Sequence, residues 1–217
     1  MHAVGIVAAA GSGLRLGADL PKALVPLAGR PLVCWAVQAL LDGGVDQVVV
    51  AVPAADDDRF EAALPGVRLV HGGATRTASV RAALAAVPGA DAVLVHDAAR
   101  PLTPPDLVAR VLAAVAAGAP AVVPVLPMID TVVTVEGEEI TGAVPRATLR
   151  RVQTPQGFDR ATLVAAYAAL DVDAELTDDA AVVRAAGHPV TTVEGDERAA
   201  KVTVAHDLAL AELQVRT

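Results

Sequence analysis

The chain has 217 residues, of which 54% are hydrophobic and 2% aromatic, and it carries a formal net charge of −8. Its length and apolar share suit one α/β domain over residues 1–217 and exclude a disordered chain, while its acidity and few aromatics argue against nucleic acid polymers as partners. It has no apolar run of the roughly 18 residues that a membrane helix needs, no evident signal peptide and a single cysteine, so we expect a cytoplasmic protein without a membrane partner.

Strand and helix patterns alternate along the first half of the chain. Short apolar runs predict strands at Val4–Ala8, Gln47–Val52, Val67–Val70, Ala92–Val95 and Ala121–Val125. Helical patterns between them lie at Pro31–Leu41, Asp57–Leu64, Arg76–Val87 and Pro105–Ala117. Nearly continuous apolar strands that alternate with helices predict a Rossmann-like α/β fold, with a mostly parallel central sheet covered by helices on both faces.

The pattern changes after Pro127. Two β-like pieces, Asp130–Glu136 and Glu139–Val144, flank the turn Gly137-Glu138 and predict a hairpin outside the main alternation. Helices at Arg160–Leu170 and Asp178–Ala186, a strand at Val190–Val193 and a helix at Ala205–Gln214 complete the chain. Because a lone two-stranded hairpin is marginally stable in water, we expect an arm at about residues 128–147 that packs on a second copy, which gives a homodimer.

The first motif of chemical interest follows the first expected strand. Residues 8–15 read A-A-A-G-S-G-L-R, and such small residues let the backbone approach a ligand and offer it N–H groups. Arg15 and Lys22 add two fixed cations, so phosphate is the favoured ligand, although an ordinary β–α turn with surface cations is the alternative. A P-loop is excluded because Ala23 follows Lys22, and a dinucleotide fingerprint because Leu16 stands where glycine is needed.

Two further motifs follow expected strands, and so should meet the first at one edge of the sheet. The segment Gly72–Ser79 opens a helix with a double glycine, so backbone N–H groups and a hydroxyl could read a base; a turn capped by Thr75 is the alternative. Past the next strand, Asp97 could hold a hydroxyl or Mg²⁺ beside Arg100, whereas His96 is more simply a core histidine. No second histidine or carboxylate stands at ligand spacing, so a dedicated metal site is not expected.

The second half of the chain contains polar segments that the expected fold does not explain. Asp130-Thr131 opens the hairpin, and R-A-T-L-R-R-V-Q-T-P-Q from Arg146 to Gln156 lies where a strand should return to the sheet. Thr177-Asp178-Asp179 is most simply a helix cap. Lys201 could bring a third cation to phosphates, although alone it would be a surface lysine.

Taken in order, these motifs resemble those of the 2-C-methyl-D-erythritol 4-phosphate cytidylyltransferase family. The matching pieces are A-A-G-S-G-x-R, P-K, G-G-x-x-R-x-x-S-V, V-H-D-A-A-R-P, D-T, T-P-Q-G-F, T-D-D and K-V-T, which cover nearly the whole chain. The resemblance implies a nucleotidyltransferase that joins CTP to methylerythritol phosphate and releases pyrophosphate. It also implies Mg²⁺ as cofactor, held mainly by the CTP phosphates, with Asp97 as a possible ligand.

The resemblance further implies a role for each matching residue. The triphosphate would be held by the catalytic residues Arg15, Lys22 and Lys201. The rest of the nucleotide would contact Ala9, Ala10, Gly11, Gly73, Ser79, Asp97 and Ala98. The acceptor would contact Asp97, Arg100, Thr131, Arg146 and Thr154, with Thr131 and Arg146 reaching it across the dimer interface. Some members carry an acidic residue where this chain has Ala74, which leaves one base contact open.

Other functions stay open at this point. The same loop and chemistry would serve a cytidylyltransferase that uses ribitol 5-phosphate, and the D-T, Arg146 and T-P-Q features favour methylerythritol phosphate only softly. Another sugar phosphate or a molybdopterin is a more distant acceptor. A non-catalytic nucleotide-binding or regulatory module is the alternative from another class, and the presence of both Arg15 and Lys22 disfavours it.

Overall fold

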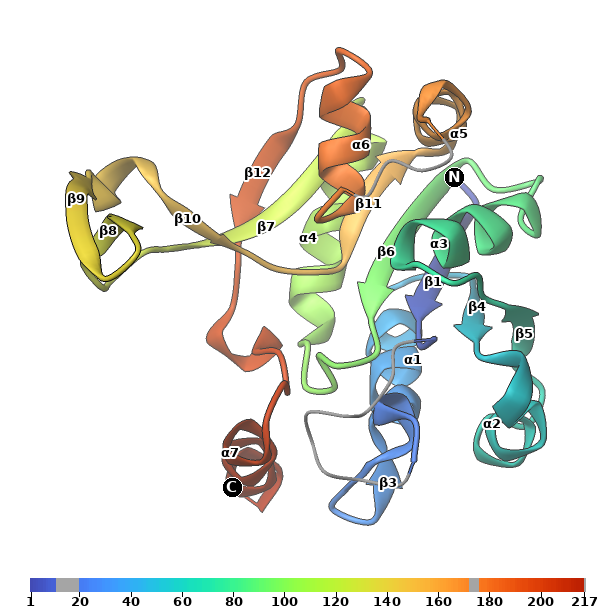
Figure 1. Ribbon diagram of the computed structural model, residues 1–217. Helices are drawn as coiled ribbons and strands as arrows, with labels where there is room; N and C mark the ends of the chain where they lie inside the picture. Colours follow the sequence, from blue (N-terminus) through green and yellow to red (C-terminus); the bar gives the residue numbers. More distant parts are fainter. Residues whose placement is uncertain (11–19, 172–175, 217) are drawn as a thin grey trace.

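A computed structural model of the chain describes residues 1–10, 20–171 and 176–216, and its centre is a sheet of eight strands (Figure 1). The strands are β1 (Ala3–Ala8), β4 (Gln47–Val52), β5 (Arg68–His71), β6 (Ala92–Asp97), β7 (Ala121–Pro127), β10 (Arg150–Val152), β11 (Gln156–Asp159) and β12 (Thr191–Glu194). Their order is β10-β7-β11-β6-β1-β4-β5, and β12 also pairs with β7. Only the pairs made by β10 and β11 are antiparallel, so the sheet is mostly parallel as predicted.

Helices cover both faces of this sheet. Because successive side chains of a strand point to opposite faces, the core consists of two layers, one on each face. One face packs Val7 and Val50 against α1 (Leu32–Asp42), α2 (Asp57–Ala63) and α4 (Pro105–Ala116). The other face packs Ile6 and Val49 against α3 (Arg76–Ala85), α5 (Arg160–Ala169) and α6 (Asp179–Ala185). The α/β fold with two covered faces is therefore confirmed.

The antiparallel strand β11 is the main element that no expected range covers. It lies between β6 and β7, where Phe158 is buried and pairs with both neighbours. Gly157 beside it allows close packing, because a Cβ there would lie 2.5 Å from the Val111 side chain. With four residues of mixed polarity, this strand has no apolar run by which it could be predicted.

Smaller elements complete the fold. A second sheet joins β2 (Pro26–Leu27) to β3 (Arg30–Pro31), and α7 (Ala205–Arg216) packs Ala211 into the cluster around Leu27. Single 3₁₀ turns lie at η2 (Lys22–Leu24), η3 (Ala54–Asp56), η4 (Arg146–Thr148) and η5 (Glu197–Ala199). No helix in the described ranges is long and apolar enough to cross a membrane.

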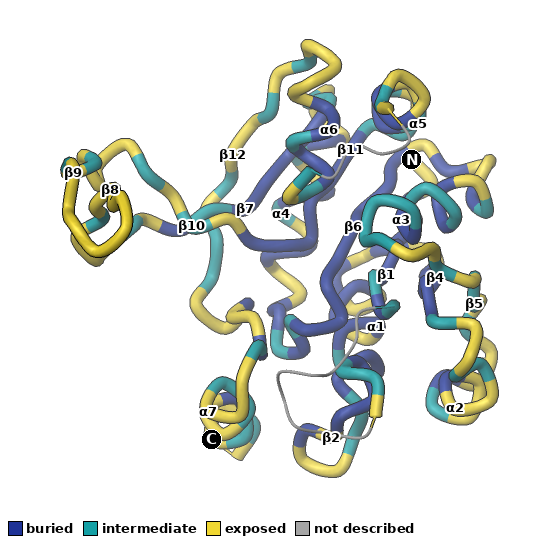
Figure 2. Tube along the Cα trace, in the orientation of Figure 1, coloured by how far each residue is buried: buried dark blue, intermediate teal, exposed yellow. Residues whose placement is uncertain are grey.

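The predicted hairpin is present and projects from the body of the molecule (Figure 1). Its strands, β8 (Val132–Glu136) and β9 (Glu139–Val144), pair with each other and with no other strand in the described part of the chain. Most of it is exposed (Figure 2), including the apolar side chains of Val135 at 62% and Ile140 at 69%. Such apolar exposure on a protruding element is typical of an interaction surface.

Candidate active site

A cavity of about 460 Å³ lies at the carboxyl ends of β1 and β6, beside the start of α3. This is where open α/β sheets bind their ligands, and the volume suits a small molecule. The residues that line it are Ala8, Ala9, Ala10, Lys22, Ala23, Gly73, Ala74, Thr75, Arg76, Ser79, Asp97, Ala98, Ala99 and Lys201. Three of the predicted motifs and Lys201 therefore meet in one place.

Backbone hydrogen bonds continue the sheet into the cavity wall. The N–H of Ala9 donates to the Ala51 carbonyl at 2.9 Å, and the N–H of Ala98 donates to the Ala8 carbonyl at 3.3 Å. The N–H of Gly72 donates to the Val52 carbonyl at 2.8 Å. These bonds fix the loops after β1, β5 and β6 relative to one another, so the cavity is preorganised by the sheet itself.

The loop before α3 is held by the Ser79 hydroxyl, which is buried. That hydroxyl accepts from the Gly73 N–H at 3.1 Å and lies 2.9 Å from the Thr75 carbonyl, to which it can donate. Thr75 caps the helix by accepting from the Ala78 N–H at 3.1 Å, as the simpler prediction had it. A Cβ on Gly72 would lie 2.8 Å from that of Ala10, so glycine permits this close approach of two loops.

Asp97 lies at the centre of a cluster of cations. Its carboxylate is 2.8 Å from Lys201 Nζ, 3.6 Å from Arg76 Nε and 3.7 Å from Arg100 Nε. Burial would raise the pKa of Asp97, but the three cations, with Lys201 foremost, hold that pKa well below its usual range. Asp97 is therefore an anion at any pH at which the protein works.

His96 and Thr154 support Asp97 from behind and do not line the cavity. Thr154 is buried, and its hydroxyl accepts from the Asp97 N–H at 3.0 Å and lies 2.9 Å from His96 Nδ1. His96 Nε2 lies 3.2 Å from the Arg100 carbonyl, which requires the proton on Nε2. Burial lowers the pKa of His96 to about 4, so the ring is a neutral, hydrogen-bonded core histidine, as expected.

Arg100 and Lys201 are positioned by long-range contacts. Arg100 donates to the Ala199 carbonyl at 2.7 Å and to the Val152 carbonyl at 3.2 Å, which ties the segment before α7 to the sheet. The Val202 N–H donates to the Ala99 carbonyl at 2.8 Å, and this bond brings Lys201 to the cavity. Arg100 itself is not among the residues that line the cavity.

Two predicted residues, Thr131 and Arg146, are not brought to this cavity by their own chain. Thr131 and Arg146 are exposed at the two ends of the hairpin arm, where Arg146 donates to the Ile129 carbonyl at 2.7 Å. Gly11 and Arg15 lie outside the described residues. Among the predicted residues that the structure describes, eight line the cavity: Ala9, Ala10, Lys22, Gly73, Ser79, Asp97, Ala98 and Lys201.

Two charged residues without a predicted site role belong to this region. Arg76 lines the cavity, and Asp179, fully buried at the start of α6, lies 2.7 Å from its guanidinium. The sequence did contain a sign of this role for Asp179. The segment Thr177-Asp178-Asp179 has two adjacent carboxylates, whereas one aspartate is enough to cap a helix.

The described residues offer few ligands for a metal ion. No group of three or more histidine, cysteine, aspartate or glutamate side chains with ligand spacing exists in the described ranges. Asp97 is the one carboxylate among the described residues of the cavity wall. A single hard oxygen ligand fits Mg²⁺ only when substrate phosphates supply further ligands.

The sequence matches a known family over nearly its whole length. Residues 3–217 match the family described as 2-C-methyl-D-erythritol 4-phosphate cytidylyltransferase. The chain is 53% identical to the protein of that name from Nocardia farcinica, over 96% of this chain and 92% of the relative, and 52% identical to that from Saccharopolyspora erythraea, over 98% of both. The crystal structure of the enzyme of that name from Thermus thermophilus superposes with a TM-score of 0.84, at 43% identity and with both chains fully covered.

Proposed function

Since the chain belongs to the 2-C-methyl-D-erythritol 4-phosphate cytidylyltransferase family, we propose that the cavity between Lys22, Gly73, Asp97 and Lys201 is its active site. The enzyme transfers the cytidylyl group of CTP to 2-C-methyl-D-erythritol 4-phosphate, giving 4-diphosphocytidyl-2-C-methyl-D-erythritol and pyrophosphate for isoprenoid synthesis. One observation carries the proposal. The chain has only two lysines, Lys22 and Lys201, and both line this cavity although they are far apart in the sequence.

The residue types suit the chemistry of phosphoryl transfer. The nucleophile is a phosphate oxygen of the acceptor, which is already anionic near neutral pH, so no general base is required. The obstacle is electrostatic, because an anion attacks the α-phosphorus of CTP in line with the departing pyrophosphate. Lys22 and Lys201, together with Arg15, would neutralise and align the phosphates, and each such preorganised donor contributes about 3 kcal/mol to transition-state stabilisation.

Lys201 must serve two anions in this scheme. Its ammonium already contacts Asp97 at 2.8 Å, and it carries three donors. The Asp97 contact fixes the ammonium at the cavity wall, and its remaining donors can face a triphosphate. The ion pair therefore orients the cation before substrate arrives, which lowers the cost of reorganisation during reaction.

The cavity also suits a pyrimidine. Ala9, Ala10 and the Gly73 backbone line the cavity and would form the wall of the base site, where backbone groups of this loop would read the cytosine amino group. Ser79 would act by holding the loop in shape, since its hydroxyl is engaged with Gly73 and Thr75. We expect CTP to be preferred over UTP by more than tenfold, because an unmatched buried polar group costs about 1–3 kcal/mol.

Mg²⁺ would be held mainly by the CTP phosphates, and Asp97 is the candidate oxygen ligand among the described residues of the cavity wall. When bound it supplies charge neutralisation and polarises the phosphoryl oxygens. Lys22 and Lys201 bind the phosphates beside it, so the protein contributes orientation and additional positive charge.

The acceptor site would be completed by a second subunit. Thr131 and Arg146 lie on an exposed arm, and an arm that packs on a partner could carry both into the partner's cavity. We therefore propose a homodimer with two composite sites. Both substrates are multiply charged phosphates that do not cross membranes unaided, so we propose the cytoplasm as the compartment of the reaction.

The direct test is pyrophosphate release by the purified protein with CTP and Mg²⁺. Methylerythritol phosphate should support turnover, and ribitol 5-phosphate should support much less. Turnover with ribitol 5-phosphate alone would reassign the acceptor. Tight CTP binding without turnover on any acceptor phosphate would favour a regulatory module.

A further inference from the structure

We infer that Asp179 is a positioning residue of this active site: it anchors the Arg76 guanidinium on the cavity wall and so keeps Asp97 available to substrate. The inference rests on the proposed function, since it takes the cavity to be the site of reaction. Asp179 does not itself line the cavity, so its effect has to pass through Arg76.

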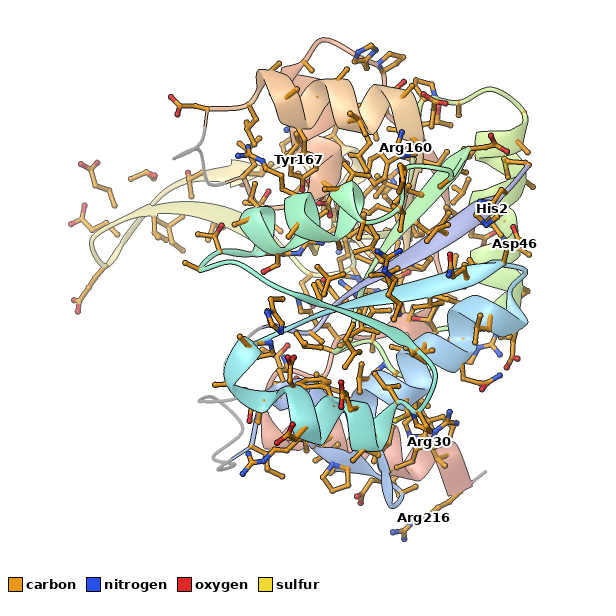
Figure 3. The ribbon with its side chains drawn as sticks, turned by 90° about the vertical axis from the view of Figure 1, so that its right-hand side faces the viewer. His2, Arg30, Asp46, Arg160, Tyr167 and Arg216 are labelled. Atoms are coloured by element: carbon orange, nitrogen blue, oxygen red, sulfur yellow. The ribbon has the colours of Figure 1, made fainter. Side chains whose placement is uncertain are left out.

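The Asp179 carboxylate joins three helices on one face of the sheet. It is fully buried at the first position of α6. The Tyr167 hydroxyl donates to it from α5 at 2.6 Å, and Arg76 approaches it from α3 at 2.7 Å. Figure 3 shows Tyr167 between α5 and α3, and the Arg81 guanidinium of α3 lies 5.9 Å from its ring centroid. A buried carboxylate is costly without such partners, so we ask what the charge of Asp179 contributes here.

Asp179 is not needed to cap α6, because Asp178 already caps that helix. Asp178 accepts from the Ala181 N–H at 2.8 Å and from the Gln156 side chain at 2.9 Å. The Gln156 side chain in turn accepts from the Ala180 N–H at 2.9 Å. The backbone N–H groups of Ala180 and Ala181 at the start of α6 are therefore hydrogen-bonded by Gln156 and Asp178. The Asp179 carboxylate is left to pair with Arg76.

Arg76 lies between two carboxylates, of which Asp97 lines the cavity and Asp179 does not. Its Nη2 is 2.7 Å from Asp179, whereas its Nε is 3.6 Å from Asp97. Burial would lower the pKa of Arg76, but Asp179 first and Asp97 second raise it above its ordinary value. The guanidinium is therefore a permanent cation whose shorter contact is with the carboxylate outside the cavity.

The way in which Arg76 is shared between the two carboxylates determines whether Asp97 can still bind substrate. Asp97 already has Lys201 at 2.8 Å and Arg100 at 3.7 Å. If Asp179 were neutral, Arg76 would move toward Asp97 as its remaining anionic partner, and substrate hydroxyls would have to compete with a third close cation. Asp179 prevents this by holding Arg76 back.

The first experiment compares two neighbouring aspartates. Asp179→Asn keeps an oxygen for the Tyr167 hydroxyl but removes the charge that holds Arg76. We expect the KM for methylerythritol phosphate to rise about 10- to 100-fold, as when a partner that orients a functional ligand is removed, with kcat changed by less than about threefold. Asp178→Asn removes the same charge from the same helix without touching Arg76. It should lower the melting temperature and leave this KM unchanged.

The second experiment asks whether the effect passes through Arg76. In an Arg76→Gln background, adding Asp179→Asn should change the KM by less than about threefold, because the residue it acts on is gone. Full additivity, or an equal KM effect of Asp178→Asn, would overturn the inference. If the wild-type protein shows no transfer at all, the proposed function fails instead.

A milder substitution tests the inference if the Asp179→Asn protein does not fold. Tyr167→Phe removes one restraint on the carboxylate and keeps the ion pair with Arg76. The KM for the acceptor should then rise about 2- to 10-fold, the range for one hydrogen bond, and this rise should disappear in the Arg76→Gln background. A rise that persists there would contradict the inference.

Discussion

At the scale of the single residue, the two lysines should account for much of the rate. Lys22 lines the cavity from a 3₁₀ turn whose next two residues, Ala23 and Leu24, are buried. Lys22→Ala should lower kcat by about 10² to 10³, the range for one preorganised charge-stabilising donor. The melting temperature should hardly change, because Lys22 is only half-buried and lies outside the hydrophobic core, where substitutions cost little stability.

Steady-state kinetics with saturating CTP and acceptor provides the measurement. Arg59→Ala is the matched control, since it removes an exposed cation that pairs only with Asp56 among the described residues. It should keep wild-type activity. A folded Lys22→Ala enzyme within about threefold of wild type would remove Lys22 from the catalytic set.

His96 makes stability depend on pH. Its pKa falls from 6.5 to about 4 on folding, chiefly through burial, so the unfolded chain binds more protons between these values. Stability contributed by the neutral ring is complete above pH 6.5 and is lost as the pH falls toward 4. The loss between about pH 7.5 and pH 5 should be about 2 kcal/mol.

Urea unfolding at these two pH values measures this dependence. His96→Gln should show a smaller difference between the two than the wild type, although its stability is lower at both. His206→Gln changes an exposed histidine and should retain the wild-type difference. An unchanged difference in His96→Gln would show that other groups cause the acid sensitivity.

At the scale of the element, the turn between β5 and α3 depends on a glycine. A Cβ on Gly73 would lie 2.5 Å from that of Ala78, so Gly73→Ala has to move the loop or the helix. Such overpacking costs about 1–3 kcal/mol, and because the displaced segment walls the cavity, the affinity for CTP should fall about 5- to 150-fold.

Calorimetric titration with CTP tests this expectation. Gly89→Ala is the control, since its added Cβ would meet nothing within 4 Å. It should bind CTP like the wild type. Equal affinity of both variants would mean that the Gly73 turn does not contact the nucleotide.

At the scale of the whole molecule, the arm predicts a shared active site. If Arg146 acts in the partner's cavity, Lys22→Ala and Arg146→Ala dimers should each be nearly inactive. A mixed dimer carries both lesions in one site and leaves the other site intact. Random remixing of equal amounts makes about half of the dimers mixed, so roughly a quarter of wild-type activity should return.

Native mass spectrometry confirms that the subunits have exchanged, and the activity is then measured on the same sample. Remixing two batches of the Lys22→Ala protein is the control and should restore nothing. Exchange without any recovered activity would show that Arg146 does not act across the interface.

The sequence by itself determined most of the fold. Apolar strands of period 2 and helical patterns are local signals, and every expected helix and strand is present in the described ranges. Strand β11 and the small sheet of β2 and β3 were not predicted, because they are short and of mixed composition. Their pairing is set by neighbours distant in the chain, which a local pattern does not contain.

The sequence also determined the family and the meeting of the motifs at one sheet edge, because parallel strands carry the loops that follow them to the same side. Only the tertiary structure decided which residues face the cavity and which stand behind it. Thr154 and Arg100 contact Asp97 without lining the cavity, and Asp179, which looked like a cap, forms an ion pair with Arg76. A side chain's role depends on the direction in which packing points it, and that direction is fixed by contacts between elements far apart in the sequence.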